Sequence, residues 1–142
     1  DCMLQFMLAI DLGIMVLIWL VQIIIYPTFM HITPDRFSAY HNRYTGRISF
    51  FVVPLMFGQL GFHGYALTRS QDVLHVLGAI LIGLAWLATF GLSVPCHHRL
   101  ASKGYDPMVI KQLVHTNWIR TVAWTGVVIL DILPVLRSAG LV

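Results

Sequence analysis

The chain alternates between long apolar stretches and shorter polar ones. Four stretches stand out, and each is close to the roughly 20 residues that an α-helix needs to cross a hydrocarbon core about 30 Å thick. They run from Met3 to Tyr26, from Ile48 to Leu67, from Val73 to Val94 and from Trp118 to Leu136. This pattern predicts an all-α fold, an integral membrane four-helix bundle that occupies residues 1–142 as a single domain.

Composition agrees with a membrane protein. Hydrophobic residues make up 58% of the 142 residues and charged residues only 11%, so the chain has too few charges to cover a soluble globule. The formal net charge of +3 does not indicate nucleic-acid binding, because basic loops beside anionic lipid account for it. The expected partners are therefore the lipid bilayer and other membrane protein subunits, and no nucleic acid.

The basic residues predict an orientation. Most of them flank the first and third connections between apolar segments, whereas only Arg69 and Arg137 lie on the opposite side. The positive-inside rule places the two basic connections in the cytoplasm and both termini on the outer side. In a bacterial inner membrane, that outer side is the periplasm. The basic set comprises Arg36, Arg43, Arg47, Arg99, Lys103, Lys111 and Arg120.

Two short motifs predict where the second and fourth helices begin. Thr33 precedes Pro34, and Asp106 precedes Pro107. A side chain that can cap a helix, followed by proline at the first helical position, is a start signal. Both helices should therefore begin with an amphipathic turn or more before they enter the lipid.

Proline also predicts where helices end or bend. Pro27 and Pro95 follow the first and third apolar segments and are expected to stop those helices, because proline has no backbone N–H to donate. Pro54 lies inside the second apolar segment, where it predicts a kink. Pro134 lies near the end of the fourth segment.

Each residue of an α-helix is rotated by about 100° from the one before it. With this rotation, the polar residues of three segments fall on one face of each helix. Because polar groups avoid lipid, these stripes should face one another inside the bundle. The third segment instead carries small residues, among them Ala79 and Gly83, which allow close approach by a neighbouring helix or another subunit. The stripes are Asp11, Met15, Ile18 and Gln22; Tyr40, His41, Tyr44, Arg47 and Gln59; and Asn117, Arg120, Thr121, Trp124, Val128 and Asp131.

Two carboxylates should lie in the outer half of the bilayer. Asp11, His63 and Asp131 reach a comparable depth on three helices, and such groups can share a proton or hold a cation. The alternative is that each aspartate is wetted at the outer surface or hydrogen-bonded to a neighbouring helix. The sequence contains no metal-binding motif, so we predict no resident metal. Asp11, His63 and Asp131 are the residues that would form a metal or proton site if the protein has one.

A second polar group should gather at the cytoplasmic end, where two helices end and two begin. His41, Arg47, His97, Asn117 and Arg120 are the candidate catalytic or binding residues there, with His31 and His98 nearby. Imidazole and guanidinium groups could bind an anionic headgroup, a quinone-like carbonyl or a phenolate. The alternative is an ordinary interfacial belt, in which basic residues contact lipid phosphate and Asn117 and Arg120 cap helix-end carbonyls.

Cofactor and reaction motifs are sparse. A haem in a four-helix bundle needs two facing histidines, and His63 and His75 are the candidate cofactor-binding pair near the outer ends of adjacent helices. The sequence has no nucleophile elbow, phosphate loop or HExxH motif. The cofactor, if there is one, is not identified by these residues.

Several features together resemble a known type of protein. The chain is about 140 residues long, Tyr26-Pro27 ends the first segment, His41 and Arg47 begin the second, and PCH is followed by NWIRT. These features resemble small four-span bacterial membrane proteins of unknown function, similar to the anthrone-oxygenase-like group. The resemblance implies a four-helix bundle and a cofactor-independent oxygenase acting on a polycyclic phenol. It assigns no catalytic residue to a position in this chain.

Two functional hypotheses follow. The first is an accessory or assembly subunit of a larger membrane complex, for example a respiratory or photosynthetic one, because no soluble domain is predicted and the third helix offers a small-residue surface. The second is a small membrane enzyme or a binder of a lipid-soluble ligand, with its site at the cytoplasmic end of the bundle. The sequence favours the first slightly, because no stretch of it demands a reaction.

Overall fold

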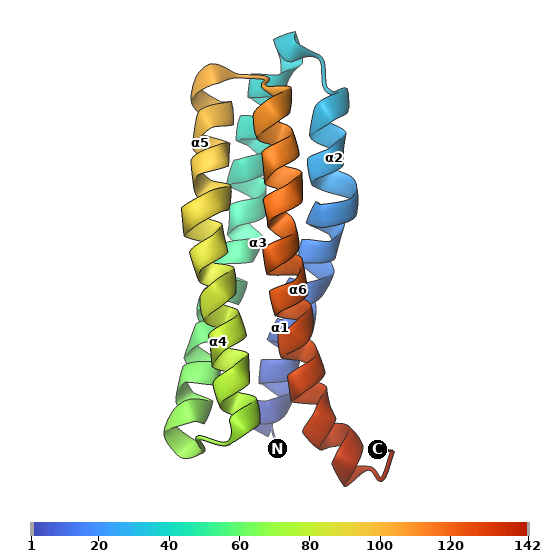
Figure 1. Ribbon diagram of the computed structural model, residues 1–142, viewed down its shortest axis with the longest axis vertical. Coiled ribbons are helices and arrows are strands. Elements are labelled where there is room, and N and C mark those ends of the chain that lie inside the picture. Colours follow the sequence, from blue (N-terminus) through green and yellow to red (C-terminus); the bar gives the residue numbers. More distant parts are fainter. Residues whose placement is uncertain (1, 142) are drawn as a thin grey trace.

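A computed structural model describes residues 2–141 as an elongated bundle of four helical spans (Figure 1). The second and fourth spans are the single helices α3 and α6, and the first and third are each built from several helical segments in series. The first span comprises α1 (Cys2–Leu20), the π-helical η1 (Val21–Ile25), α2 (Tyr26–Thr28) and the 3₁₀-helical η2 (Phe29–His31). The others are α3 (Pro34–Arg69); α4 (Val73–Ala88), the π-helical η3 (Thr89–Ser93) and α5 (Val94–Lys103); and α6 (Pro107–Ser138).

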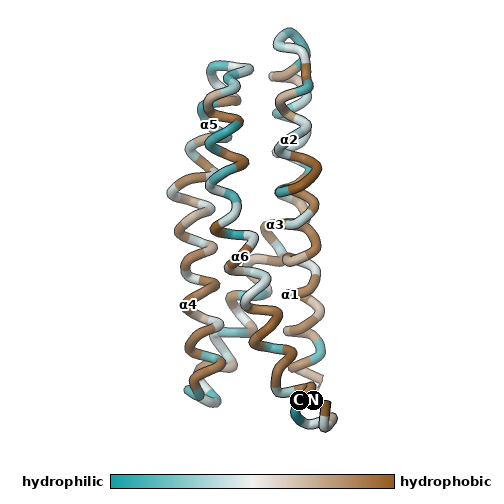
Figure 2. The backbone as a smooth tube through the Cα atoms, turned by 45° about the vertical axis from the view of Figure 1, so that its right-hand side comes forward, coloured by the Kyte–Doolittle hydropathy of each residue, from teal (hydrophilic) through white to brown (hydrophobic). Residues whose placement is uncertain are grey.

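All four spans found in residues 2–141 are long and apolar enough to cross a membrane. The start of α1, the turn between α3 and α4 and the end of α6 lie at one end of the bundle, called here the terminal end (Figure 1). The connections from η2 to α3 and from α5 to α6 lie at the other, called the loop end. Hydrophilic residues gather at both ends, and hydrophobic ones predominate between them (Figure 2). The predicted all-α architecture with four membrane-capable helices is thus confirmed.

The second and fourth helices begin where the sequence predicts, at Pro34 and Pro107. Asp106 caps α6, since its carboxylate accepts hydrogen bonds from the backbone amides of Met108 and Val109. The expected cap by the Thr33 hydroxyl is wrong, because that side chain makes no capping hydrogen bond. Proline has no N–H to satisfy and has a φ angle already suited to a helix, so α3 can start without the cap.

The prediction that Pro27 and Pro95 stop their helices is wrong. Both residues lie inside continuous helical spans, and each is preceded closely by a π-helical segment. A proline ring collides with the carbonyl four residues earlier, which belongs here to Ile23 in η1 and to Gly91 in η3. The wider turn of a π-helix moves that carbonyl away from the ring, so the helix continues. Pro54 also lies within an unbroken helix, α3.

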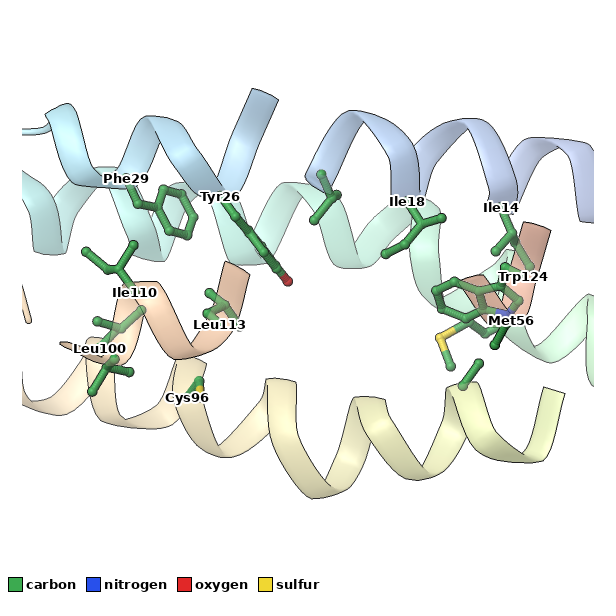
Figure 3. Packing of buried hydrophobic residues seen from close by; sticks show 14 of the residues in the cluster. Ile14, Ile18, Tyr26, Phe29, Met56, Cys96, Leu100, Ile110, Leu113 and Trp124 are labelled. Carbon is green, nitrogen blue, oxygen red and sulfur yellow. The ribbon is translucent and has the colours of Figure 1, made fainter. Parts of the chain in front are cut away.

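The apolar core is one cluster, in which the large side chains form two groups along the bundle (Figure 3). Tyr26, Phe29, Leu100, Ile110 and Leu113 pack together on the loop-end side. Ile14, Ile18, Met56 and Trp124 pack nearer the terminal end. Buried polar side chains form two further clusters, one between these two groups and one nearer the terminal end. Both are described next.

Helix α4 packs closely along α6. A Cβ atom added at Gly126 of α6 would lie only 2.8 Å from Leu81 Cδ1 of α4, so the absence of a side chain permits this approach. Gly78, Ala85 and Ala88 of α4 face the bundle interior. Gly83 is exposed, which leaves part of the predicted small-residue surface free of any neighbour within the bundle.

Candidate functional site

A buried arginine lies at the centre of the loop-end cluster. Arg120 of α6 is only 6% exposed. Its Nη2 donates to the Tyr26 hydroxyl at 3.0 Å, its Nη1 donates to Thr89 Oγ1 at 3.5 Å, and its Nε donates to Asn117 Oδ1 at 2.9 Å. In the described part of the chain, no carboxylate lies within ion-pair distance of this guanidinium. A buried charge is normally paired with an opposite one, so Arg120 is held by neutral acceptors alone.

A group of amides and hydroxyls fixes the position of Arg120. Asn117 Nδ2 donates to Gln22 Oε1 at 2.8 Å, and Thr121 Oγ1 donates to the same oxygen at 3.1 Å. Gln22 Nε2 in turn donates to the Val114 carbonyl at 3.1 Å. Gln22 lies in η1 and Thr89 begins η3. Thr89 accepts directly from Arg120, and Gln22 holds Asn117, so both π-helical segments contribute a polar side chain to the cluster. Such segments often occur at functional sites.

Two histidines extend the cluster from Tyr26. The Tyr26 hydroxyl lies 2.9 Å from His97 Nε2, and His97 Nδ1 lies 2.9 Å from His41 Nε2. The ring of Phe37 stacks on His41 with centroids 5.5 Å apart. Because Arg120 donates to the tyrosine oxygen, the hydroxyl proton can point to His97, which can then donate to His41 from Nδ1. The result is a continuous hydrogen-bonded path from Arg120 to His41 that can relay a proton.

A cavity of about 390 Å³ opens beside this path. Its polar wall includes Arg120, Tyr26, His97, His41 and Thr89. Its other walls are apolar and come from α1, η1, α3 and α6: Ile14, Leu17, Ile18, Val21, Val52, Met56 and Trp124. The space is therefore amphipathic, with a cationic and hydrogen-bonding end and a hydrophobic body.

The mouth of the cavity lies between α3 and α5. Ser49 of α3 and His98 and Ala101 of α5 belong to the lining and are exposed on the outside of the bundle. A lipid-sized molecule could reach the interior through this lateral opening without passing along the bundle axis.

The structure brings together four of the five candidates predicted at this end. His41, His97, Asn117 and Arg120 meet in the cluster, whereas Arg47 is exposed and does not line the cavity. Six residues along a helix turn the side chain about 120° away from His41, so the expectation that Arg47 shares that face is wrong. Tyr40, predicted on the same face, is also exposed. His31 is exposed away from the cluster, and His98 lies at the mouth.

The capping role considered for Asn117 and Arg120 is also wrong. Their donors bind side chains rather than helix-end carbonyls, and the first and third spans continue past this level. The sequence reasoning did not single out Thr89 and Ser93, which line the cavity from η3. Two hydroxyl residues four positions apart in an otherwise apolar segment were the available signal.

The second buried cluster lies nearer the terminal end. His63 Nε2 is 2.9 Å from Asp11 Oδ2 and 3.5 Å from Asp131 Oδ2. Gln59 Nε2 donates to Asp11 Oδ1 at 2.6 Å, and Trp124 Nε1 donates to Gln59 Oε1 at 3.0 Å. The three candidates for a proton or cation site therefore do lie together. Trp124, which also lines the cavity, lies between the two clusters.

His75 belongs to neither cluster. It lies in the first turn of α4, where its Nδ1 is 2.7 Å from Asp72 Oδ2. The backbone amide of His75 donates to the same carboxylate and holds the pKa of Asp72 below its ordinary value, with the side chains of His75 and Ser70 adding to the shift. Since His63 and His75 are bonded to different aspartates, the geometry gives no support to a haem held between them.

Comparison of the chain with protein-family models, with curated proteins and with solved structures finds no match. The function must therefore be argued from the two buried polar clusters and the cavity.

Proposed function

We propose that this protein binds a lipid-soluble molecule of the quinone or phenol class, with a carbonyl or phenolate oxygen held at Arg120 and the apolar body in the cavity. The observation that carries this proposal is the buried guanidinium of Arg120, which lines the cavity and has only neutral partners among residues 2–141.

Charge and hydrogen bonding both favour an electron-rich ligand. Burying a cation without a counter-charge costs several kcal/mol. Hydrogen bonds to Asn117, Tyr26 and Thr89 use both Nη2 hydrogens, the Nε hydrogen and one Nη1 hydrogen, so one of the five N–H groups of the guanidinium is left for another acceptor. A ligand oxygen that is anionic or strongly polarised would take this hydrogen and balance the charge.

The size and lining of the cavity suit the same class of ligand. A volume of about 390 Å³ lies within the range of small-molecule sites, which are mostly apolar with a few converging polar groups. Isoleucine, leucine, valine and methionine side chains surround the part away from Arg120. The mouth between α3 and α5 supports entry from the surrounding lipid.

The histidines supply the acid–base chemistry that a quinone or phenol requires. A proton at the ligand oxygen could pass through the Tyr26 hydroxyl to His97 and on to His41, over two links of 2.9 Å each. A neutral imidazole accepts a proton at one ring nitrogen and donates one from the other, so each histidine can pass a proton along the path. The phenolic substrate implied by the resemblance to the anthrone-oxygenase-like group belongs to this ligand class, and oxygenase activity itself stays a prediction.

Fluorescence quenching tests the proposal, because Trp124 lines the cavity. The protein, purified in a mild detergent, is titrated with decylubiquinone and, separately, with a hydroxyanthraquinone. At least one of them should quench saturably, and Trp124→Phe should remove most of the signal. Arg120→Gln should weaken binding at least tenfold, a loss of about 1.4 kcal/mol.

Arg47→Gln is the matched control, since Arg47 is an exposed arginine outside the cavity. It should bind both probes as the unmodified protein does. Equal affinity of the Arg120→Gln and Arg47→Gln variants would contradict the proposal. Mass spectrometry of a solvent extract of the natively purified protein would identify the bound molecule.

A groove on the outside of the bundle favours a second role, as an accessory subunit of a larger complex. It has a volume of about 310 Å³ and lies between α3 and α4. Gly64, Ala79 and Gly83 in its lining would let an apolar helix of another subunit pack closely. Native mass spectrometry after gentle extraction should then show a stoichiometric partner that Gly83→Leu releases. A free monomer under the same conditions would exclude this role.

The orientation in a bacterial inner membrane is also a proposal, based on the basic residues of the loop end. We place the loop end in the cytoplasm and the terminal end in the periplasm. In a Cys2→Ser background, Ser70→Cys and Ser102→Cys put an exposed thiol at the terminal and loop ends respectively. A membrane-impermeant maleimide applied from outside should label position 70 and not position 102, and the reverse result would invert the orientation.

A further inference from the structure

We infer that Asp11, His63 and Asp131 form a binding site for one divalent first-row transition-metal ion. The three side chains come from α1, α3 and α6, and the inference is independent of the ligand proposed for the cavity. Two carboxylates and one imidazole are a donor set suited to Mn²⁺, Fe²⁺, Co²⁺ or Zn²⁺.

The distances fit a metal centre. One donor atom from each residue can be chosen so that all three lie within 4.8 Å of one another. His63 Nε2 is 2.9 Å from Asp11 Oδ2 and 3.5 Å from Asp131 Oδ2. Donor atoms bound at about 2.1 Å to one ion lie roughly 3 to 3.5 Å apart. An ion can thus be accommodated with only a small movement of the side chains.

Charge and burial call for a cation at this point. The side chains of Asp11, His63 and Asp131 are 0%, 4% and 10% exposed. No lysine or arginine in the described ranges forms an ion pair with either aspartate. When both carboxylates are ionised, the cluster has more negative than positive charge in a low-dielectric setting, and a divalent ion would neutralise it.

The Oδ2 atom of Asp131 gives an independent indication. It is buried and has no hydrogen-bond partner among residues 2–141, although it faces His63 Nε2 at 3.5 Å. A buried carboxylate oxygen without a partner is costly. Coordination to an ion shared with His63 and Asp11 would satisfy it.

The surroundings hold the ligands as they do in known metal sites, where neighbouring groups orient the ligating side chains. Gln59 donates to Asp11 at 2.6 Å and is itself held by Trp124 at 3.0 Å. Gly78 of α4 brings its backbone against the imidazole, since a Cβ there would lie 3.8 Å from His63 Nδ1. The ring is thereby confined between α4 and the two carboxylates.

Cobalt binding tests the site. The purified protein in detergent, in a Cys2→Ser background to remove the exposed thiol, is treated with EDTA, freed of the chelator and titrated with Co²⁺. We expect one Co²⁺ per chain, with visible bands typical of oxygen and nitrogen ligands, and displacement by Zn²⁺. Asp131→Asn and His63→Gln should each weaken Co²⁺ binding at least tenfold.

The exposed Asp72–His75 pair provides a matched control, because its atoms are as close, 2.7 Å, but lie in a surface turn. His75→Gln should leave the Co²⁺ affinity and spectrum unchanged. Circular dichroism and thermal unfolding verify that each variant is folded, and Asp131→Asn, which preserves shape, stands in if His63→Gln does not fold. Cobalt binding that is absent in the unmodified protein, or that survives Asp131→Asn and His63→Gln alike in folded protein, would overturn the inference.

Discussion

Arg120 of α6 and Tyr26 of α2, which are 94 residues apart in the chain, are joined inside the bundle by a 3.0 Å hydrogen bond from Nη2 to the phenol oxygen. This bond links the guanidinium on one helix to the phenol on another. On one side, Asn117 and Thr89 hold the guanidinium. On the other, Tyr26 contacts His97 and completes the proton path. The positive charge and the path to His41 therefore act on the same end of the cavity.

Placing an anion beside Arg120 should compete with the ligand. Asn117→Asp keeps the shape of residue 117 and replaces the neutral acceptor of Arg120 by a carboxylate. The variant loses the hydrogen bond from Asn117 Nδ2 to Gln22 Oε1, but the ion pair supplies the missing counter-charge, so we expect it to fold. It should bind decylubiquinone or the hydroxyanthraquinone at least tenfold more weakly. Trp124 quenching measures the affinity.

Asn117→Ala distinguishes this electrostatic effect from simple loss of a side chain. It leaves donors of Arg120 without their acceptor, which should lower the free energy of unfolding by about 1–3 kcal/mol. Thermal unfolding in detergent measures the difference between the two variants. If Asn117→Asp binds the ligand as tightly as the unmodified protein does, the ligand does not bind through the unpaired charge of Arg120.

Gly126→Ala should weaken the packing of α6 on α4. The new Cβ would lie 2.8 Å from Leu81 Cδ1, and the end of that flexible side chain must move. Alanine favours a helix over glycine by about 1 kcal/mol, and we expect the displacement of Leu81 to offset that gain by about 1 kcal/mol, at the low end of the overpacking range. Gly61→Ala on α3 is the control, because a Cβ at that position meets nothing within 4 Å. Equal thermal stability of the two variants would show that α4 and α6 are not in close contact at Leu81.

Acid should destabilise the turn between α3 and α4. Asp72 accepts hydrogen bonds from the amides of Leu74 and His75, and its pKa is lower in the folded protein than its ordinary value of 3.8. The ionised carboxylate therefore stabilises the fold. This contribution is complete above the unfolded pKa and is lost as the pH falls through the folded one.

Asp72→Asn isolates that contribution, because asparagine caps a helix about as well as aspartate but does not titrate. Between about pH 5 and pH 3, the Tm of the unmodified protein should fall more steeply than that of Asp72→Asn. Parallel curves would mean that the carboxylate charge adds nothing at this turn. His75→Gln should lie between the two, since the backbone amide of residue 75 remains.

Individual residues show how much of the structure the sequence alone predicts. The position of Pro107 after Asp106 was enough to locate the start of α6, because capping is a local interaction. The burial of Asp11 and Gln59 followed from helical periodicity. Continuation of the helices through Pro27 and Pro95 did not, because it depends on π-helical turns whose extra residue is invisible in the pattern. The predicted shared face of Arg47 and His41 is wrong, because six residues place the two side chains about 120° apart around α3 and leave Arg47 exposed.

The sequence by itself determined the all-helical architecture, the four membrane-capable spans and the buried polar residues of the first, second and fourth spans, since hydropathy and periodicity are properties of each segment alone. Only the tertiary structure decided that Arg120 meets Tyr26 and Asn117, that His97 meets His41, and that Asp11, His63 and Asp131 converge. The distance between side chains on different helices depends on the rotation and the axial position of each helix. Packing across the whole bundle sets both, and a single segment contains neither.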